Sequence, residues 1–350
     1  MSTPPDDDGI GIFSDDGGGA AARRRSRSHW PRRILITFIV LVVVILAAGA
    51  LYAASLNHSF SRNLKHANDL PPDQPTAPGQ SPRPQKPSND HSLNFVLMGS
   101  DSRDPANMQD NGRSDTLMIV HLASNRRSAD IISFPRDMYV SIPGHGKNKI
   151  NAAYSFGGPQ LAVATLEQLT GARMDHVAQV DFEGFINLTN TLGGVTVYND
   201  HAFTDRGYTF PKGKITIQGQ QALVFVRERH NLPNGDLDRA ANQRKVVQAI
   251  IAKGMSGGTI SNPLKFNSFV SGVAENVTVD NSLTTGDVRS IALSLRMTPD
   301  NIKQIQAPIS GFATVSGAGD VDVVDQPKMA QLAKDLRTDD LAAYLKKYPG

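Results

Sequence analysis

The sequence predicts an α/β protein, with a single α/β/α sandwich domain around a central mixed sheet and one transmembrane helix before it. Short apolar, β-prone runs alternate with helix-like segments from residue 93 to residue 340. The first three of these runs follow one another without a helix between them, which favours a mixed sheet over a purely parallel one. Residues 34–54 form an uncharged apolar run long enough to cross a membrane as a helix.

Composition excludes several classes of protein. The 350 residues are 39% hydrophobic and 20% charged, which is ordinary for a globular protein. A net charge of +3 gives no support to nucleic-acid binding, so no nucleic-acid partner is expected. The chain has no cysteine, which rules out disulfides, a thiol nucleophile and cysteine-ligated metals.

The predicted transmembrane helix has a predicted orientation. Six arginines precede it and the far side carries fewer basic residues, so the N-terminus is expected in the cytoplasm and the rest outside the cell membrane. These arginines are Arg23, Arg24, Arg25, Arg27, Arg32 and Arg33. A cleavable signal peptide is the alternative, because small residues such as Ala48 and Ala50 resemble a cleavage region. The length of the apolar run favours a retained anchor.

Domain boundaries follow from shifts in composition. Residues 1–33 are Asp/Gly-rich and then Arg-rich, and are predicted to be a disordered cytoplasmic tail. Residues 34–54 are the anchor, and the proline-rich residues 55–92 are predicted to form an extended linker. The folded, extracytoplasmic domain is expected over residues 93–340, followed by a C-terminal tail over 341–350.

Strands are predicted at residues 94–99, 115–122, 129–134, 176–182, 195–199 and 222–229, from short β-prone runs between polar turns. Helices are predicted at 157–171, 183–194, 236–254, 262–276, 284–295 and 326–336. Gly171 and Gly254 are expected to end two of them.

Charged side chains gather where the predicted strands begin and end. Asp101 follows the first strand, Arg113 and Asp115 lead into the second, and Arg136 follows the third. Ligands commonly bind at strand ends of open α/β sheets. Arg227 and Arg229 are expected on one face of the strand over 222–229, and Arg239 and Gln243 on one face of the next helix.

Clustered guanidinium groups repel one another and need a multiply charged anion. The planar fork of arginine matches phosphate oxygens, and two carboxylates among the arginines suit Mg²⁺ or Mn²⁺. A pyrophosphate with one divalent ion is therefore the predicted ligand. The alternative is that these residues form surface salt bridges. His230 is predicted to be a solvated turn residue rather than a general acid.

Six linked motifs resemble the LytR-CpsA-Psr family of Gram-positive cell envelopes over roughly residues 93–340. They are GSDSR, GRSDTLMIVHL, ISFPRDMYVSIPGHGKNKINAAYSFGG, VDFEGFINLTNTLGGVTV, LVFVRERH and GDLDRAANQR. The resemblance implies an α/β/α fold with an apolar tunnel for a polyprenyl chain. It implies a phosphotransferase that moves an anionic glycopolymer from a polyprenyl-pyrophosphate lipid to peptidoglycan through a phosphodiester link.

The resemblance also implies residue roles. Asp101 and Asp115 match the metal-ligating aspartates. Arg113 and Asp236 also lie within the motifs, and they are expected among the catalytic residues together with Asp101, Arg136, Arg227 and Arg229. The pyrophosphate-binding set is Arg136, Arg227, Arg229, Arg239 and Gln243. Asn242 stands where relatives often carry a second arginine, so Arg244 is a possible substitute. Either Asp101 or Asp236 is a candidate for the general base.

Three other functions stay open from the sequence. A non-catalytic binder of a lipid-linked polymer would keep the arginines without needing the paired aspartates. A regulator of envelope functions is disfavoured, because the folded domain is expected outside the membrane. Hydrolysis of a pyrophosphoryl lipid is the third alternative, at the same site but without an acceptor.

Overall fold

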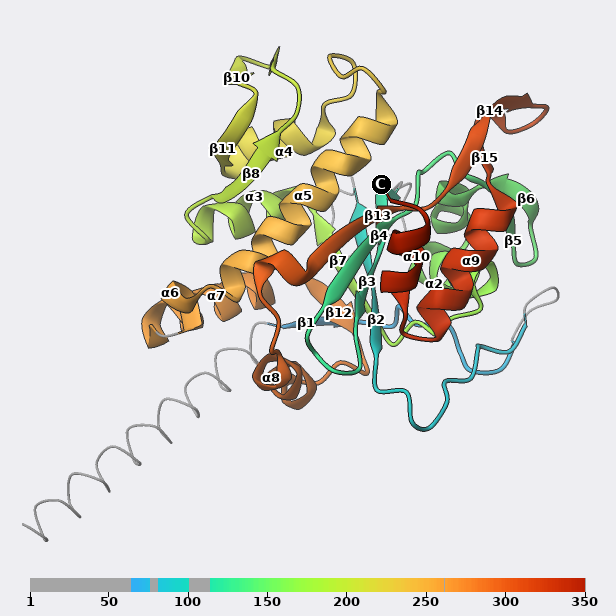
Figure 1. Cartoon of the computed structure of the whole chain (residues 1–350), viewed down its shortest axis with the longest axis horizontal. Helices are drawn as coiled ribbons and strands as arrows, with labels where there is room; N and C mark the ends of the chain where they lie inside the picture. The colour runs from blue at the N-terminus through green and yellow to red at the C-terminus, as the bar shows by residue number, and fades with distance from the viewer. Residues whose placement is uncertain (1–63, 76–80, 101–113, 261, 350) are drawn as a thin grey trace, which may run out of the picture. The chain divides into compact units, whose positions relative to one another are not determined.

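The computed structural model describes residues 64–75, 81–100, 114–260 and 262–349, all within one compact unit, Ala54–Gly350 (Figure 1). The predicted tail and anchor, residues 1–54, lie outside the described residues. Among the described residues, no helix is both long and apolar enough to span a membrane.

A seven-stranded mixed sheet forms the centre of the domain, in the order β1-β12-β7-β2-β3-β4-β13. Its strands are β1 (Lys65–Ala67), β2 (Leu93–Ser100), β3 (Ser114–Leu122), β4 (Ala129–Ser133), β7 (His176–Asp181), β12 (Thr278–Asp280) and β13 (Ile302–Gln306). The strands β2, β3 and β4 form an antiparallel meander, whereas β7 runs parallel to β2 and β13 parallel to β4. The predicted mixed sheet is therefore confirmed.

Helices cover both faces of this sheet, as the alternation of apolar side chains along its strands requires (Figure 1). On β3, Leu117 and Ile119 face a core shared with α2 (Ile150–Thr170), α9 (Gln326–Arg337) and α10 (Leu341–Lys347). Met118, between them, faces α5 (Asp236–Gly254) on the other side. The remaining helices are α3 (Phe182–Thr191), α4 (Gly219–Arg227), α6 (Gly257–Ile260), α7 (Pro263–Asn276), α8 (Thr285–Ser294) and the 3₁₀ turn η1 (Pro299–Asn301).

Four two-stranded sheets extend the domain. They pair β5 (Tyr139–Ile142) with β6 (Gly146–Lys149), β8 (Val195–Asn199) with β11 (Gly213–Ile217), β9 (Phe203–Asp205) with β10 (Tyr208–Phe210), and β14 (Ile309–Val315) with β15 (Gly319–Val324). The predicted strand over 195–199 and the predicted helix over 236–254 are confirmed. Gly171 ends α2 in the left-handed region, with φ of 64°, also as predicted.

The strand predicted over residues 222–229 is wrong, because this segment forms helix α4. Five consecutive apolar residues, Ala222–Val226, are all buried there. An apolar run of this length has no period that separates a buried strand from a buried helix. The helix begins at Gly219, whose φ of 55° is accessible to glycine at little cost.

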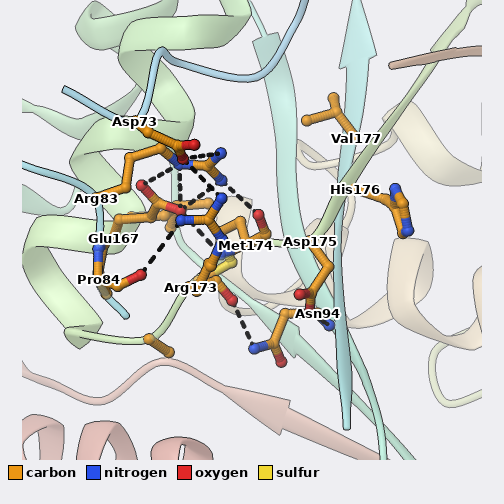
Figure 2. A network of polar contacts seen from close by, with 12 residues as sticks. Asp73, Arg83, Pro84, Asn94, Glu167, Arg173, Met174, Asp175, His176 and Val177 are labelled. Carbon is orange, nitrogen blue, oxygen red and sulfur yellow. Dashed lines mark hydrogen bonds and ion pairs between the residues drawn. The ribbon is translucent and has the colours of Figure 1, made fainter. Parts of the chain in front are cut away.

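The structure differs from the predicted linker over residues 55–92. β1 is an edge strand of the central sheet, and Leu64 is buried beside it. Further along, Arg83 is 7% exposed and pairs with the buried Glu167 of α2 at 2.8 Å, while donating a hydrogen bond to the carbonyl of Met174 (Figure 2). The proline content of residues 55–92 gave no sign that this chain packs against the domain.

The C-terminal residues 341–349 also differ from the predicted tail. They include α10, whose Leu341 and Tyr344 are buried in the core shared with α2 and α9. Asp340 caps this helix by accepting a hydrogen bond from the backbone N–H of Ala343. The folded domain therefore extends beyond residue 340.

Candidate active site

An apolar cavity of about 630 Å³ lies beside the central sheet. Side chains from β2, β7, α3, α5 and α7 line it, among them Phe95, Ala178, Phe185, Leu188, Val246, Ile250 and Val273. These residues come from the inward faces of amphipathic elements that leave space between them instead of closing on one another. The cavity suits a long apolar group such as a lipid chain.

Four of the predicted arginines also line this cavity, and they are called the arginine cluster below. The cluster consists of Arg136, Arg227, Arg229 and Arg239. Arg239 is 7% exposed, so its charge is held in a largely desolvated position. The cavity therefore combines apolar walls with a concentration of fixed positive charge, which is the shape of a site for an amphipathic anion.

Different elements supply the four arginines. Arg136 follows β4, Arg227 is the last residue of α4, Arg229 lies between α4 and α5, and Arg239 is in the first turns of α5. The Arg227 guanidinium stands 4.4 Å from the centre of the Phe182 ring. This cation–π contact, together with the negative end of the α4 dipole, favours a cation at that position. Arg227 and Arg229 thus line the same cavity, although they do not lie on the strand predicted for them.

Asp236 is a carboxylate that pairs with three members of the arginine cluster. Its Oδ2 lies 2.9 Å from Nε of Arg136, and its Oδ1 lies 3.4 Å from Arg239 and 3.6 Å from Arg229. Oδ1 is buried and has no hydrogen-bond partner in the described part of the chain. Surrounded by guanidinium groups, Asp236 offsets their mutual repulsion and fixes their spacing. This arrangement suits a positioning residue better than a general base.

Polar contacts fix the segment that carries Arg229. The Gln243 side chain donates a 3.2 Å hydrogen bond to the carbonyl of Val226, joining α5 to the end of α4. Glu228 is 4% exposed and accepts hydrogen bonds from the backbone and side chain of Asn231. Burial opposes ionisation of Glu228, but these hydrogen bonds outweigh it and hold the pKa of the carboxyl below its usual value. Gln243 lines the cavity as well, as predicted for the pyrophosphate site.

Comparison with known proteins shows to which family the chain belongs. Residues 54–338 match the LytR_cpsA_psr family. The chain belongs to the LytR-CpsA-Psr family. It is 35% identical over 292 residues to the polyisoprenyl-teichoic acid–peptidoglycan teichoic acid transferase TagU of Bacillus anthracis, covering 83% of this chain and 92% of that protein. The corresponding TagU of Bacillus subtilis is 35% identical over 246 residues, or 70% of this chain and 77% of that protein.

Solved structures agree with the family membership. B. subtilis TagV aligns with a TM-score of 0.62 at 26% identity, over 72% of this chain and 98% of that chain. A structure titled TagT bound to LIIa-WTA aligns with a TM-score of 0.57 at 27% identity, over 73% of this chain and 92% of that chain. The mixed α/β architecture around a central mixed sheet is therefore that of LytR-CpsA-Psr structures.

The predicted metal site lies mostly outside the described residues. Asp101 and Arg113 are not among them, and only the backbone of Asp115 is described. The backbone of Ser100, the last residue of β2, pairs with that of Ser114, the first residue of β3. Among the described side chains, no group of three or more His, Asp or Glu residues is arranged to hold a metal. The roles of Asp101, Arg113 and Asp115 remain predictions.

Arg244 does not replace the arginine that relatives carry at position 242. It is buried, hydrogen-bonds through Nη1 to Oγ of Ser133 at the end of β4, and is not among the residues that line the cavity. Burial lowers the pKa of Arg244 to about 10. Asn242 is 4% exposed. The arginine cluster of this family member is thus assembled without a contribution from either position.

Asp322 of β15 is an acidic residue near the arginine cluster that sequence reasoning missed. It is 9% exposed, and its backbone N–H donates a 2.8 Å hydrogen bond to the carbonyl of Asp137, next to Arg136. Burial, and then repulsion from Asp137 and Asp236, raises the pKa of Asp322 to about 6. Nothing in the sequence distinguishes it from Asp320, two residues earlier on the same strand, which is exposed.

We expect Asp322→Asn to stabilise the protein at pH 7.5 and not at pH 4. The carboxyl has a folded pKa of about 6 against an ordinary 3.8, so its ionised form is disfavoured in the folded state. This cost is fully present above pH 6 and shrinks as the pH falls through 6 toward 4, because the folded state then binds the proton. The expected gain is about 1–3 kcal/mol in the free energy of unfolding. Urea unfolding at the two pH values measures it, and an equal effect at both would contradict the assignment.

Proposed function

We propose that this protein is a phosphotransferase that moves an anionic glycopolymer from a polyprenyl-pyrophosphate carrier to peptidoglycan, forming a phosphodiester link. The observation that carries the proposal is the 630 Å³ apolar cavity with the arginine cluster in its wall. A polyprenyl chain fits the apolar part, and its pyrophosphate fits the arginines. The names of the TagU relatives describe transfer of teichoic acid from a polyisoprenyl carrier to peptidoglycan.

The chemistry follows from the charge that develops in the reaction. A hydroxyl oxygen of the acceptor sugar forms a bond to the phosphorus that carries the polymer. The bond from that phosphorus to the bridging pyrophosphate oxygen breaks, and polyprenyl phosphate leaves with the electron pair. Arg136, Arg227 and Arg229 stabilise the negative charge on the transferred group and on the leaving phosphate. Asp236 pairs with Arg136 and Arg229 and keeps those two side chains spaced for that purpose.

We further propose Mg²⁺ or Mn²⁺ as the cofactor, held by Asp101 and Asp115. Carboxylate oxygens are the ligands that these ions prefer, and in the sequence Asp101 directly follows β2 while Asp115 is the second residue of β3. The ion would supply positive charge to the pyrophosphate oxygens. Asp101 is also the proposed proton acceptor for the sugar hydroxyl, since Asp236 is engaged by three arginines.

The proposed location is the cell membrane, with a retained anchor over residues 34–54, the N-terminus in the cytoplasm and the catalytic domain outside. The lipid carrier and the peptidoglycan acceptor both support this arrangement, because the transfer must take place where the two meet. Protease treatment of intact cells tests it: the domain is expected to be degraded while an N-terminal tag survives.

The test of the proposed function is release of polyprenyl phosphate by the full chain in detergent. A polyprenyl-pyrophosphate-linked glycopolymer is supplied with peptidoglycan fragments, with and without Mg²⁺. Metal-dependent release with polymer appearing on the peptidoglycan is the expected result. Tight binding of the lipid with no release, even with acceptor present, would instead support a non-catalytic binder. Release without attachment would support hydrolysis.

We expect Ala178→Phe to weaken binding of polyprenyl pyrophosphate by roughly 30-fold, because the ring excludes two or three methylene groups of the lipid at about 0.8 kcal/mol each. Ala178 lines the apolar part of the cavity on β7. Isothermal titration measures the effect, with Ala178→Val as an intermediate step. Binding of inorganic pyrophosphate should be unchanged, and a parallel loss of both ligands would mean that the variant has disturbed the whole site.

A further inference from the structure

The β14–β15 hairpin stands directly beside the segment that carries Arg136. Met138 and Asp322 form a parallel bridge, so β15 continues alongside β5. The backbone hydrogen bond from Asp322 to Asp137 reinforces this contact. Met138, which pairs with Asp322, lies two residues after Arg136 in the chain. One face of the hairpin therefore begins beside the segment that carries Arg136 and extends away from it.

Asp322 lies on this face and lacks a partner for its charge. It is 9% exposed, and its carboxylate makes no hydrogen bond or ion pair with the described part of the chain. The carboxylate oxygens of Asp322 are not among the buried polar atoms that lack a partner, so they reach the surface and are open to an external donor. Asp137 and Asp236 face it from the β4–β5 connection and from α5, while Lys149 of β6 and Arg136 offset them in part.

Phe312 lies directly opposite Asp322 on the neighbouring strand. Residues paired in this way share one face of an antiparallel pair, with Cβ atoms about 5 Å apart. The Phe312 side chain is 72% exposed, which is unusual for an aromatic residue in a regular strand. Thr314 and Asp320, the next pair on the same face, are polar and hydrogen-bonded to each other at 2.7 Å. An exposed ring, an unpartnered carboxylate and a polar pair thus form one surface.

We propose that this surface, formed by Phe312, Thr314, Asp320 and Asp322, binds the saccharide acceptor. A sugar ring has an apolar C–H face that stacks on an aromatic side chain, and hydroxyl groups that donate to carboxylates. The hydroxyls supply the donor that Asp322 lacks. This inference rests on the proposed function and adds to it the place where the acceptor lies.

Charge decides which of the two substrates this surface takes. The donor polymer and its pyrophosphate are anionic, and Asp320 and Asp322 would repel them. The glycan of peptidoglycan offers neutral hydroxyl-bearing rings, which carry no such penalty. The arginine cluster therefore binds the anionic donor, and the acidic, aromatic face of the hairpin binds the neutral acceptor beside it.

The test measures acceptor and donor separately in the full chain. Transfer is followed at varied concentrations of peptidoglycan oligosaccharide with Phe312→Ala and Asp322→Asn, and polyprenyl-pyrophosphate binding is measured by titration. Phe312→Ala is expected to raise the acceptor KM roughly fivefold to tenfold, the size of a stacking contact, with donor affinity unchanged. Asp322→Asn is expected to raise the acceptor KM and to remove a loss of transfer on acidification toward pH 6. The matched control is Val323→Ala, on the opposite face of the same hairpin and 37% exposed, which should leave both quantities unchanged.

The outcomes separate this inference from the function on which it rests. If the wild-type chain binds the donor and transfers polymer, yet Phe312→Ala leaves the acceptor KM unchanged, the acceptor surface is wrong and the proposed function stands. If the wild-type chain neither binds the donor nor transfers polymer, both fall. An equal rise in acceptor KM for Val323→Ala would also overturn the inference, because it would show that the hairpin acts only through its fold.

Discussion

Replacement of Arg227 by alanine should lower the rate of polymer transfer roughly 100- to 1,000-fold, the usual effect of removing one donor that stabilises developing negative charge. The Arg227 guanidinium lies over the Phe182 ring in the cavity wall, and this contact favours one position for its charge. Arg227→Lys should recover only part of the rate, because an ammonium group keeps the charge but loses the planar fork. Single-turnover release of polyprenyl phosphate measures the chemical step directly.

The matched control for this experiment is Arg127→Ala. Arg127 is an exposed arginine just before β4, whereas Arg136 of the arginine cluster follows the other end of that strand. Its removal changes net charge by the same amount as Arg227→Ala and should leave transfer unaffected. A comparable loss in both variants would attribute the effect to overall charge. Full activity of Arg227→Ala would contradict the assignment of the arginine cluster to the pyrophosphate.

The second large effect is expected on stability, from Arg83→Leu. Glu167 is 3% exposed, and it accepts an ion pair and hydrogen bonds from Arg83 and one further hydrogen bond from the backbone N–H of Met174 (Figure 2). Removal of the arginine leaves a buried carboxylate without its cation, at a cost of about 3–5 kcal/mol in the free energy of unfolding. Urea unfolding monitored by circular dichroism measures the loss.

Two further variants make this prediction specific. Arg173→Leu breaks a pair with Asp73, which is 66% exposed, and should cost no more than about 1 kcal/mol. The double change of Arg83 and Glu167 to leucine should recover much of the stability, because it removes both buried charges together. If Arg83→Leu is no more harmful than Arg173→Leu, the buried pair does not hold residues 81–92 against the domain.

Much of the fold could be predicted because its helices and strands are strongly marked. The helix over 236–254 carries acidic residues in its first turn, and the meander from β2 to β4 has short apolar runs between polar turns. α4 was mistaken for a strand because its five consecutive buried apolar residues, Ala222–Val226, show no helical period. Segment 81–92 was mistaken for a free linker because its anchoring depends on a partner, Glu167, that is distant in sequence.

The candidate site was predictable in its chemistry but not in its geometry. Clustered arginines indicated a phosphate ligand, and four of them do line one cavity. The cavity itself could not be predicted, since residues such as Val246 and Ile250 look the same in sequence whether they pack against a core or face a void. Asp322 escaped notice for a related reason: its acidic neighbours, Asp137 and Asp236, come from the β4–β5 connection and from α5, far away along the chain.

The pairing of β1 with β12 has a consequence for the order in which the protein folds. A strand at residues 65–67 completes its sheet with one at 278–280, and β4 pairs with β13 at 302–306. Contacts this far apart in sequence form slowly and cannot form before the later strands are synthesised. The sheet thus closes only after nearly the whole chain has emerged. For the extracytoplasmic location proposed above, this delay would keep the chain unfolded until its translocation is almost complete.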